Sequence, residues 1–566
     1  MAKFEGTPNR VPFFMTQLAP FQQLARLCLR RGVENVIICP GSRNAALTVA
    51  FTKQKGLNCF SISDERSAGY IALGMALQTG KTSVIICTSG TAALNFAPAV
   101  AEAYFQEIPL LVLTADRPPE WVHQYDGQTI FQENLYGKHV KNAFSWSPNQ
   151  TIEDIEEAAK ISNDALNSCQ NQPFGPVHIN IPIREPFYPE TVNEIHEEWV
   201  IKEHKETTQT VDIASFRSVL EKSKKRLLVI GQQHDEYVTA EAKDFAEKFG
   251  FVLVADNIAN TNGAIQNHDQ FLRNAHKEIL IPDLLISTDM SVISKSLKLM
   301  LRNGDIKEHW HIQKNPAFID PFRSLTQKVE VEPQYFFKQV SESSASEINV
   351  NYQEAWESLE KRSSEAIDTY FAKPVFSEFH ILKVILQQMP AHSIIHSGNS
   401  MSIRYLNALQ AYTDQSLRVY CNRGTSGIDG SLSTAVGQAL ATNKTVYCIL
   451  GDLSFQYDKN ALWNRYLPDN LKVIILNNAG GIIFNMIDGP KKQDAFQDFF
   501  RTEQPNKADL IAQEYGLAYL SIKEESQIES RISEFFQMKE KCILEIFTDY
   551  DNNVTAFKAF FEDQVH

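Results

Sequence analysis

Two short polar segments in the last third of the chain carry residue types that bind metal ions. The segment GDLS begins at Gly451 after the apolar run TVYCIL, and NNAGG begins at Asn477 after KVIIL. Asp452 offers a carboxylate, Asn478 an amide oxygen and Gly480 a backbone carbonyl, and Mg²⁺ takes oxygen ligands of this kind. Because Mg²⁺ usually keeps phosphate oxygens in its shell, the two segments together indicate an ion that holds a diphosphate. Gly451 would let the backbone pass close to the phosphates.

Each segment also has a simpler structural interpretation. Asp452 alone is typical of a helix N-cap, and Asn477 with Asn478 is typical of an Asx turn. Taken singly, each segment favours that structural role. Together, at the ends of two predicted strands, the segments favour the metal ion.

A further carboxylate, Glu65, lies in SISDERSAGYIALG, just after an apolar strand and at the start of a predicted helix. A glutamate in a first helical turn is commonly explained by the helix dipole, which favours negative charge there. A carboxylate beside an apolar ligand would instead have its pKa tuned by burial. The local sequence alone favours the first explanation.

The elements that must position these residues are short apolar runs separated by helical patterns. The runs cover 35–41, 59–63, 83–90, 109–118 and 177–182, then 226–232, 251–257 and 282–288, and finally 392–400, 418–424, 445–452, 472–478 and 542–549. Continuous apolar runs suit parallel strands that are buried on both faces. Ligands of open α/β sheets bind at the carboxyl ends of such strands, where the polar segments lie.

We therefore predict an α/β protein made of three doubly wound parallel-sheet domains. The predicted domains cover 1–190, 205–340 and 353–566, and polar linkers are expected at 189–210 and 341–352. The outer two domains are similar in style.

Composition narrows the class of protein. The chain has 566 residues, 43% of them hydrophobic and 22% charged, which is ordinary for a globular protein of about three to four domains. No apolar run reaches the length of about 18 residues that spans a bilayer, and the N-terminal segment lacks the pattern of a signal peptide. The net charge of −14, without a Lys/Arg block, argues against nucleic acid. Eight scattered cysteines favour a reducing compartment, and we expect a cytoplasmic protein.

The GD and NN segments resemble the fingerprint of thiamine-diphosphate enzymes, although Leu453 stands where most members have glycine. Other motifs resemble one branch, the 2-succinyl-5-enolpyruvyl-6-hydroxy-3-cyclohexene-1-carboxylate synthases of menaquinone biosynthesis. These motifs are PGSRNAALTVA, SISDERSAGYIALGMA, TSGTAALNFAPAV, LTADRPPE, HINIPIREPFYP, SGNSMSIR and NRGTSGIDGSLSTA. The resemblance spans roughly residues 13–490 and is weaker in the middle domain, where PDLLIST and Lys295 match.

The resemblance implies a thiamine-diphosphate-binding fold with thiamine diphosphate and Mg²⁺ or Mn²⁺ as cofactors. The first domain would bind the pyrimidine and the third the diphosphate and metal. Glu65 would hydrogen-bond the pyrimidine and promote its imino tautomer, and Ile428 would hold the cofactor bent. The cofactor-binding positions implied are Glu65, Gly90, Thr91, Ile428, Gly451, Asp452, Leu453, Ser454, Asn478, Gly480, Gly481, Ile483 and Phe484, with Asp452, Asn478 and Gly480 on the metal. The protein would be a homodimer or homotetramer with active sites between subunits.

The substrates implied by the resemblance are 2-oxoglutarate and isochorismate, and arginine forks suit their carboxylates. The implied substrate-binding positions are Ser42, Arg43, Arg117, Gln128, Lys295, Asn399, Ser400, Arg404, Arg423 and Phe484. Ser400 and Gln128 are candidates for proton handling beside Glu65. Ser296 follows Lys295 at a position where the family often has arginine. The resemblance therefore does not settle how many cationic contacts to substrate the middle domain makes.

The implied reaction is decarboxylation of 2-oxoglutarate followed by 1,4-addition of the resulting carbanion to isochorismate. The alternative within enzymes is another thiamine-dependent 2-oxoacid decarboxylase or carboligase of the acetolactate-synthase type. A non-catalytic α/β scaffold is a different class, and the set Glu65, Asp452 and Asn478 argues against it. A nicotinamide enzyme is disfavoured because no strand–GxGxxG–helix stretch is present.

Overall fold

The computed structural model describes residues 18–146, 152–185, 200–202, 210–234, 238–273, 277–345, 347–487 and 489–562. These residues form three sheets, and every strand pairing within them is parallel, which confirms the predicted fold class. The chain divides into two compact units. The first contains the chain up to residue 205 together with 433–442 and 459–467, and the second contains the remainder. Most of the predicted linker 189–210 lies outside the described residues.

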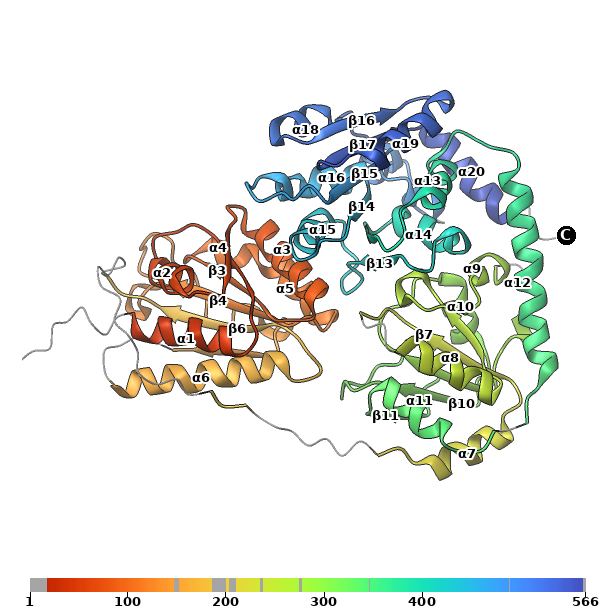
Figure 1. Cartoon of the computed structure of the whole chain (residues 1–566), viewed down its shortest axis with the longest axis horizontal. Coiled ribbons are helices and arrows are strands. Elements are labelled where there is room, and N and C mark those ends of the chain that lie inside the picture. Colours follow the sequence, from red (N-terminus) through yellow and green to blue (C-terminus); the bar gives the residue numbers. More distant parts are fainter. Residues whose placement is uncertain are drawn as a thin grey trace, which may run out of the picture. The chain divides into compact units, whose positions relative to one another are not determined.

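The first unit contains a six-stranded sheet in the order β2-β1-β3-β4-β6-β5. Its strands are β1 (Asn35–Ile38), β2 (Asn58–Ser61), β3 (Ser83–Cys87), β4 (Leu110–Asp116), β5 (Asn142–Ser145) and β6 (Val177–Pro182). Helices α1 (Ala19–Arg30), α2 (Ala45–Lys53) and α6 (Ile152–Gln170) cover one face. Helices α3 (Glu65–Thr79), α4 (Thr91–Asn95) and α5 (Ala97–Phe105) follow β2 and β3, and α3 packs on β1 and β3 (Figure 1). Strand β5 was not predicted, because it is a mostly exposed edge strand without an apolar run.

Helix α3 is held in the first unit by a close backbone contact with residues 433–442. A Cβ atom on Gly74 would lie 2.1 Å from the carbonyl oxygen of Thr434, and one on Gly437 would lie 2.0 Å from that of Ile71. Only glycine at both positions allows this approach. The contact fixes the helix whose first residue is Glu65.

The second unit begins with a five-stranded sheet in the order β11-β10-β9-β7-β8. Its strands are β7 (Arg226–Ile230), β8 (Val252–Ala255), β9 (Leu284–Thr288), β10 (Glu308–Ile312) and β11 (Gln327–Val329). Helices α7 (Ile213–Lys222), α8 (Val238–Phe249) and α11 (Pro333–Ser341) share one core, and α9 (His268–Phe271) and α10 (Lys295–Asn303) share another. Strands β10 and β11 were not predicted. Strand β10 lies inside the sheet, but His309 and His311 interrupt its apolar sequence. Both imidazole rings are hydrogen-bonded to Ser287 Oγ.

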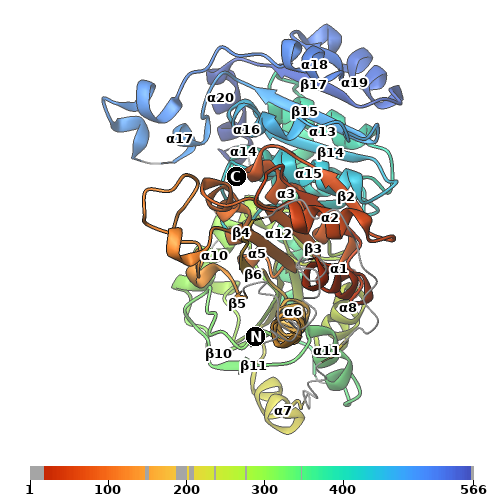
Figure 2. The same ribbon diagram turned by 90° about the vertical axis from the view of Figure 1, so that its left-hand side faces the viewer.

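A second six-stranded sheet completes this unit, in the order β13-β12-β14-β15-β17-β16. Its strands are β12 (Ile394–Ser397), β13 (Arg418–Cys421), β14 (Val446–Gly451), β15 (Leu471–Asn477), β16 (Ala518–Ile522) and β17 (Cys542–Phe547). Its helices within this unit are α13 (Glu378–Gln388), α14 (Met401–Ala408), α16 (Asp452–Asp458), α17 (Ile483–Met486), α18 (Asp509–Tyr515), α19 (Ile528–Gln537) and α20 (Tyr550–Glu562), several of which are labelled in Figure 2. Helix α15 (Ser431–Leu440), which follows β13 in the chain, belongs to the first unit from Ser433 onward. Counted from its own first strand, each six-stranded sheet has the same order, 2-1-3-4-6-5. Edge strand β16 was not predicted.

Helix α12 (Val350–Phe371) connects the two cores of the second unit. Tyr352 and Trp356 pack into the core of the five-stranded sheet, whereas Ile367 packs into the core of the six-stranded one. Figure 1 shows α12 as a single long helix. The linker predicted at 341–352 therefore overlaps the start of a helix. The boundaries of the three predicted domains stay predictions.

A buried polar cluster around Asp256 joins the same two sheets. The Asp256 carboxylate accepts hydrogen bonds from the backbone N–H of Ile293, from the N–H of Ser294 (3.0 Å) and from Asn407 Nδ2 (2.9 Å), and it lies 3.2 Å from His268 Nε2. Ser294 caps α10, and Asn407 lies on α14. The cluster therefore sets the start of α10 against α14.

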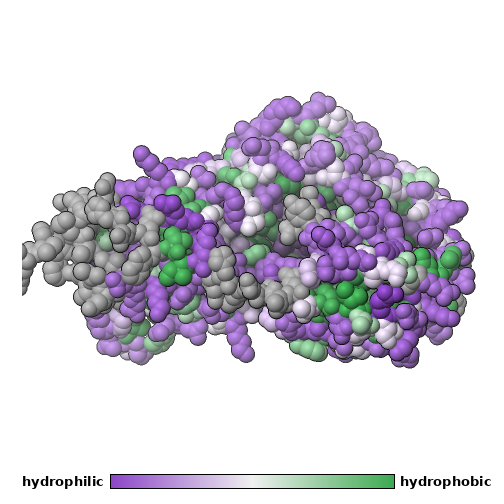
Figure 3. All heavy atoms as spheres, turned by 60° about the horizontal axis from the view of Figure 1, so that its bottom comes forward, coloured by the Kyte–Doolittle hydropathy of each residue, from purple (hydrophilic) through white to green (hydrophobic). Residues whose placement is uncertain are grey.

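The described surface is mostly hydrophilic in the view of Figure 3, with small hydrophobic patches. Among the described residues, no helix combines the length and the apolar character needed to cross a membrane. All eight cysteines are free, and seven of them are buried.

The Asp256–His268 pair predicts a pH-dependent stability. Burial disfavours the His268 imidazolium, but the hydrogen bond and charge of Asp256 outweigh it and raise the pKa of His268 above its usual value. Since this pKa is raised, the stabilisation is complete below the unfolded pKa and is lost as pH rises through the folded one. We expect His268→Gln to lower the free energy of unfolding by about 1.5–3 kcal/mol near pH 6 and by clearly less near pH 9.

Urea denaturation of the wild type and His268→Gln at both pH values measures this difference. An equal or larger loss of stability near pH 9 would contradict a charged pair.

Candidate active site

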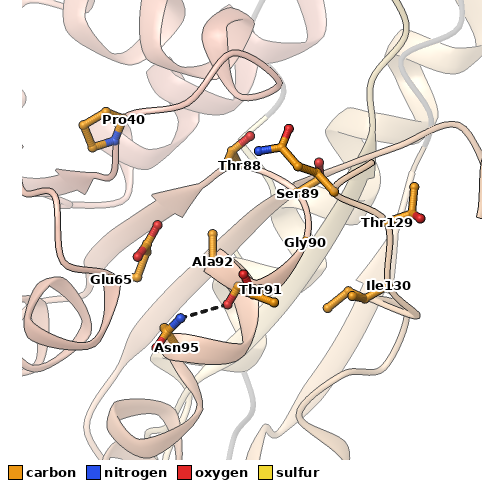
Figure 4. Close-up of a pocket in the computed structure, with 11 residues that line it drawn as sticks. Pro40, Glu65, Thr88, Ser89, Gly90, Thr91, Ala92, Asn95, Thr129 and Ile130 are labelled. Atoms are coloured by element: carbon orange, nitrogen blue, oxygen red, sulfur yellow. Dashed lines mark hydrogen bonds between the residues drawn. The ribbon is translucent and has the colours of Figure 1, made fainter. Parts of the chain in front are cut away.

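The first unit contains a pocket of about 530 Å³ at the carboxyl ends of its central strands. Glu65 lies on one side of it, Thr129 and Ile130 lie on the opposite side, and segment 88–92 lies between them (Figure 4). Of the predicted site residues, Glu65, Gly90, Thr91 and Gln128 line this pocket. The structure therefore brings together the three predicted cofactor-binding residues of the first domain and Gln128, a predicted proton-handling residue.

Glu65 is half-buried at the first position of α3, after the N-cap Asp64, whose side chain accepts from Ser67 N at 2.9 Å. Burial raises the pKa of Glu65, the negative charge of Asp64 adds to this rise, and a backbone hydrogen bond opposes it. Asp64 already serves as the helix cap, so Glu65 is not needed for that role. Its raised pKa suits a carboxyl group that shares a proton with a ligand.

Gln132 holds the wall of this pocket in place, although no sequence motif indicated it. Its Oε1 accepts from Gly90 N at 2.7 Å, and its Nε2 donates to the carbonyl oxygen of Ala115 and to Asn180 Oδ1, both at 3.1 Å. Gly90 has φ +89°, and a Cβ atom there would lie 3.2 Å from Cα of Gln128. Glycine is thus required where the loop of Gln128 approaches the backbone.

Arg43 and Arg117 lie together, and neither lines the pocket. Their guanidinium carbons lie 5.8 and 5.9 Å from the ring centre of Trp121. Arg43 Nη1 donates to the carbonyl oxygen of Ile183 at 2.8 Å, and Arg117 Nη1 lies 3.3 Å from Asp126 Oδ2. Ser42, next to Arg43, is exposed. The structure therefore places these two predicted substrate-binding arginines around Trp121 and outside the lining of the pocket.

The second unit contains a pocket of about 420 Å³, in which most predicted site residues meet. Its lining includes Asn399, Ser400, Arg404, Arg423, Ile428, Gly451, Asp452, Leu453, Ser454, Asn478, Gly480, Gly481, Ile483 and Phe484. The two polar segments meet because β14 and β15 are parallel neighbours with Gly451 opposite Leu476.

Of the residues predicted to hold a divalent metal, Asn478 offers an oxygen atom that has no hydrogen-bond partner in the described part of the chain, whereas the Gly480 carbonyl oxygen accepts from Ile482 N at 3.1 Å. Asn478 Nδ2 donates to Glu378 Oε1 at 2.7 Å, and Asn478 Oδ1 is buried without a hydrogen-bond partner among the described residues. Asp452 accepts from Leu453 N (2.8 Å) and Gln504 Nε2 (2.7 Å), and burial raises its pKa to about 6. The described residues contain no cluster of three or more His, Cys, Asp or Glu side chains that could hold a metal ion.

The glycines of the two segments have different surroundings. A Cβ atom added to Gly451 would meet nothing within 4 Å, so open space lies where phosphates are expected. One added to Gly480 would lie 2.9 Å from the carbonyl oxygen of Arg501, and Gly481 N donates to that oxygen at 2.6 Å. Gly480 and Gly481 are thus also required by the close approach of a neighbouring segment.

Ile428 is not an ordinary core isoleucine, because 42% of its side chain is exposed although it lines a pocket. Its carbonyl oxygen accepts from Ser454 Oγ at 2.6 Å, which fixes it to the GDLS segment. An exposed apolar side chain at this position suits contact with an apolar part of a ligand.

Polar residues after β12 and β13 form the cationic side of this pocket. Arg423 Nη1 donates to Asn399 Oδ1 at 2.9 Å, and Asn399 Nδ2 donates to the carbonyl oxygens of Asn422 and Gly427 at 2.7 and 2.8 Å. Arg404 donates to the carbonyl oxygen of Ser400. Ser400 has φ +67°, an unfavourable backbone conformation of the kind often found at functional sites.

Two lysines lie in the first turn of α10, and neither of them lines the pocket of the second unit. Lys295, the predicted residue, opens the helix and is exposed. Lys298, which the sequence did not indicate, is partly buried and donates to the carbonyl oxygen of Val292 at 2.9 Å. Burial lowers the pKa of Lys298, and the positive charges of Arg423 and Arg404 lower it further. Lys298 is therefore a third cation near these arginines.

Comparisons with known proteins agree with this geometry. Family models match in succession, namely the N-terminal TPP binding domain of thiamine pyrophosphate enzymes over residues 21–140, the middle domain of thiamine pyrophosphate over 192–396 and the C-terminal TPP binding domain over 403–546. The fold, the two pockets and these matches define a thiamine-pyrophosphate-dependent enzyme.

The similar curated relatives are named 2-succinyl-5-enolpyruvyl-6-hydroxy-3-cyclohexene-1-carboxylate synthase. The relative from Cytophaga hutchinsonii is 40% identical over 95% of this chain and 97% of its own length, and that from Desulfotalea psychrophila is 38% identical over 93% and 97%. The relative from Bacteroides thetaiotaomicron is 34% identical over 95% and 97%. The chain belongs to the 2-succinyl-5-enolpyruvyl-6-hydroxy-3-cyclohexene-1-carboxylate synthase family.

Proposed function

We propose that the protein decarboxylates 2-oxoglutarate and adds the resulting carbanion to isochorismate in a 1,4-addition. The products are 2-succinyl-5-enolpyruvyl-6-hydroxy-3-cyclohexene-1-carboxylate and CO₂, a step of menaquinone biosynthesis. The observation that carries this proposal is the pocket of the second unit, which combines metal-binding oxygens with arginines. Family membership favours this reaction over that of an acetolactate-synthase-like enzyme.

Thiamine diphosphate would supply the electron sink for the decarboxylation when bound. Asp452, Asn478 and Gly480 would hold Mg²⁺ or Mn²⁺, and Gly451, Leu453, Ser454 and Gly481 would bind the diphosphate. Ile428, Ile483 and Phe484 would provide apolar contacts, and Gly90 and Thr91 would bind the pyrimidine. Glu65 would hold a proton at its carboxyl group for the pyrimidine nitrogen, a role that its raised pKa supports.

The cations would bind the substrate carboxylates. Arg404 and Arg423 line the pocket of the second unit, with Asn399, Ser400 and Phe484 beside them. Arg43, Arg117 and Ser42 would act from the first unit, and Lys295 from the middle domain. Holding both substrates at reacting distance accelerates bond formation by proximity. Ser400 and Gln128 are the proposed proton-handling groups.

The same proposal includes assembly and location. We infer a homodimer or homotetramer in which Glu65 and Asp452 of one active site come from different subunits. The exposed apolar side chains Leu94, Phe105 and Phe131 of the first unit support an interface there. The free cysteines support a cytoplasmic location.

The deciding experiment measures isochorismate consumption with 2-oxoglutarate, thiamine diphosphate and Mg²⁺, omitting each component in turn. Loss of isochorismate that requires all of them is the expected result. Release of CO₂ without isochorismate loss would assign the enzyme a different acceptor. No reaction and no cofactor binding would overturn the catalytic proposal.

Glu65→Gln tests the role of the proton on this side chain. Glutamine keeps the size of the side chain but supplies no acidic proton, so we expect kcat to fall by at least about 10²-fold, in line with general acid–base contributions. Thermal unfolding should change little, because Asp64 and not Glu65 caps α3. Wild-type turnover in Glu65→Gln would refute the role.

Lys298→Gln tests whether Lys298, a cation near Arg404 and Arg423, helps to bind a substrate carboxylate. Loss of a charged hydrogen-bonding group is expected to raise KM for one of the two carboxylate substrates by about tenfold or more. Lys295→Gln measures the predicted neighbour in the same assay, and Lys307→Gln serves as control because Lys307 is exposed and paired with Asp305. An unchanged KM in Lys298→Gln would limit Lys298 to its structural bond with Val292.

A further inference from the structure

Glu378 is a buried carboxylate that the sequence motifs did not indicate. It opens α13, its backbone N–H donates to Asn553 Oδ1 at 2.8 Å, and only 1% of the residue is exposed. It lines the pocket of the second unit together with Asp452 and Asn478. Its backbone is thus fixed by the fold while its side chain faces the proposed metal site.

The bond between Glu378 and Asn478 decides which atom of the asparagine amide is available. A carboxylate oxygen that accepts a hydrogen bond from an amide turns the NH₂ group of that amide toward itself. The structure has this arrangement, with Asn478 Nδ2 2.7 Å from Glu378 Oε1. The amide oxygen therefore points the other way, where it is buried and has no hydrogen-bond partner among the described residues.

The neighbouring asparagine provides an internal comparison. Asn477 Nδ2 also donates to a buried glutamate, Glu545 Oε1, at 2.7 Å. However, Asn477 Oδ1 accepts from Ala479 N at 3.1 Å, so both ends of that amide are used by the fold. Two adjacent asparagines thus have the same glutamate contact, and only Asn478 keeps an oxygen available.

We propose that Glu378 is a positioning residue that orients the Asn478 amide so that Oδ1, and not Nδ2, binds the divalent metal. The inference rests on the proposed metal site. Groups that orient metal ligands in this way typically contribute a factor of about 10–100 to metal affinity.

The test measures Mn²⁺ affinity of the full-length protein saturated with thiamine diphosphate, using the EPR signal of free Mn²⁺. We expect Glu378→Leu to weaken binding by about 10–100-fold and Glu378→Gln, which retains an acceptor oxygen, to weaken it less. Glu545→Gln is the matched control and should change the affinity by less than about threefold, because Asn477 keeps its bond to Ala479. Thermal unfolding without metal verifies that each variant is folded.

A double-mutant cycle separates orientation from charge. In an Asn478→Asp background the side chain presents an oxygen in either orientation, so Glu378→Leu should no longer weaken Mn²⁺ binding. An equal loss in both backgrounds would overturn the orienting role, as would wild-type affinity in Glu378→Leu. Failure of the wild type to bind Mn²⁺ would instead overturn the metal site itself, together with this inference.

Discussion

The parallel pairing of β14 with β15 is the constraint on which the proposed site depends. Parallel neighbours end at the same edge of a sheet, so the residues that follow them must meet there. Here the register opposes Gly451 to Leu476, which brings Asp452 and Asn478 into one pocket. The ends of β12 and β13 bring Asn399 and Arg423 to the same edge.

The buried polar groups of the second unit differ in how far their hydrogen-bonding capacity is used. Asp256 receives several donors, and its cluster sets α10 against α14. In contrast, Asn478 Oδ1 and Arg423 Nε are buried without a partner among the described residues. Leaving such atoms unpaired costs free energy of about 1–3 kcal/mol each, and a ligand that pairs them recovers it. These two atoms differ from other unpaired buried atoms because their residues line the pocket of the second unit, where a ligand can reach them.

The sequence indicated most strands because buried parallel strands are continuous apolar runs. It did not indicate β5, β11 and β16, which are edge strands, or β10, whose histidines are buried through bonds to Ser287. The sequence did indicate pocket-lining residues that directly follow predicted strands, because there the strand end and the motif coincide. Glu378, Gln132 and Lys298 were not, because each comes from a helix or loop whose contacts form only when the chain folds.

The two six-stranded sheets show how one topology holds different chemistry. Their strands correspond one to one, so Glu65 after β2 matches the position of Arg423 after β13, and the start of α4 after β3 matches that of α16 after β14. In the same way Arg117 follows β4 as Asn478 follows β15. Glu65 in the first sheet thus corresponds to a cation, Arg423, in the other sheet. Arg117 in the first sheet corresponds to an amide, Asn478. Strand order fixes only where the side chains meet, and the residues placed at those positions decide what they bind.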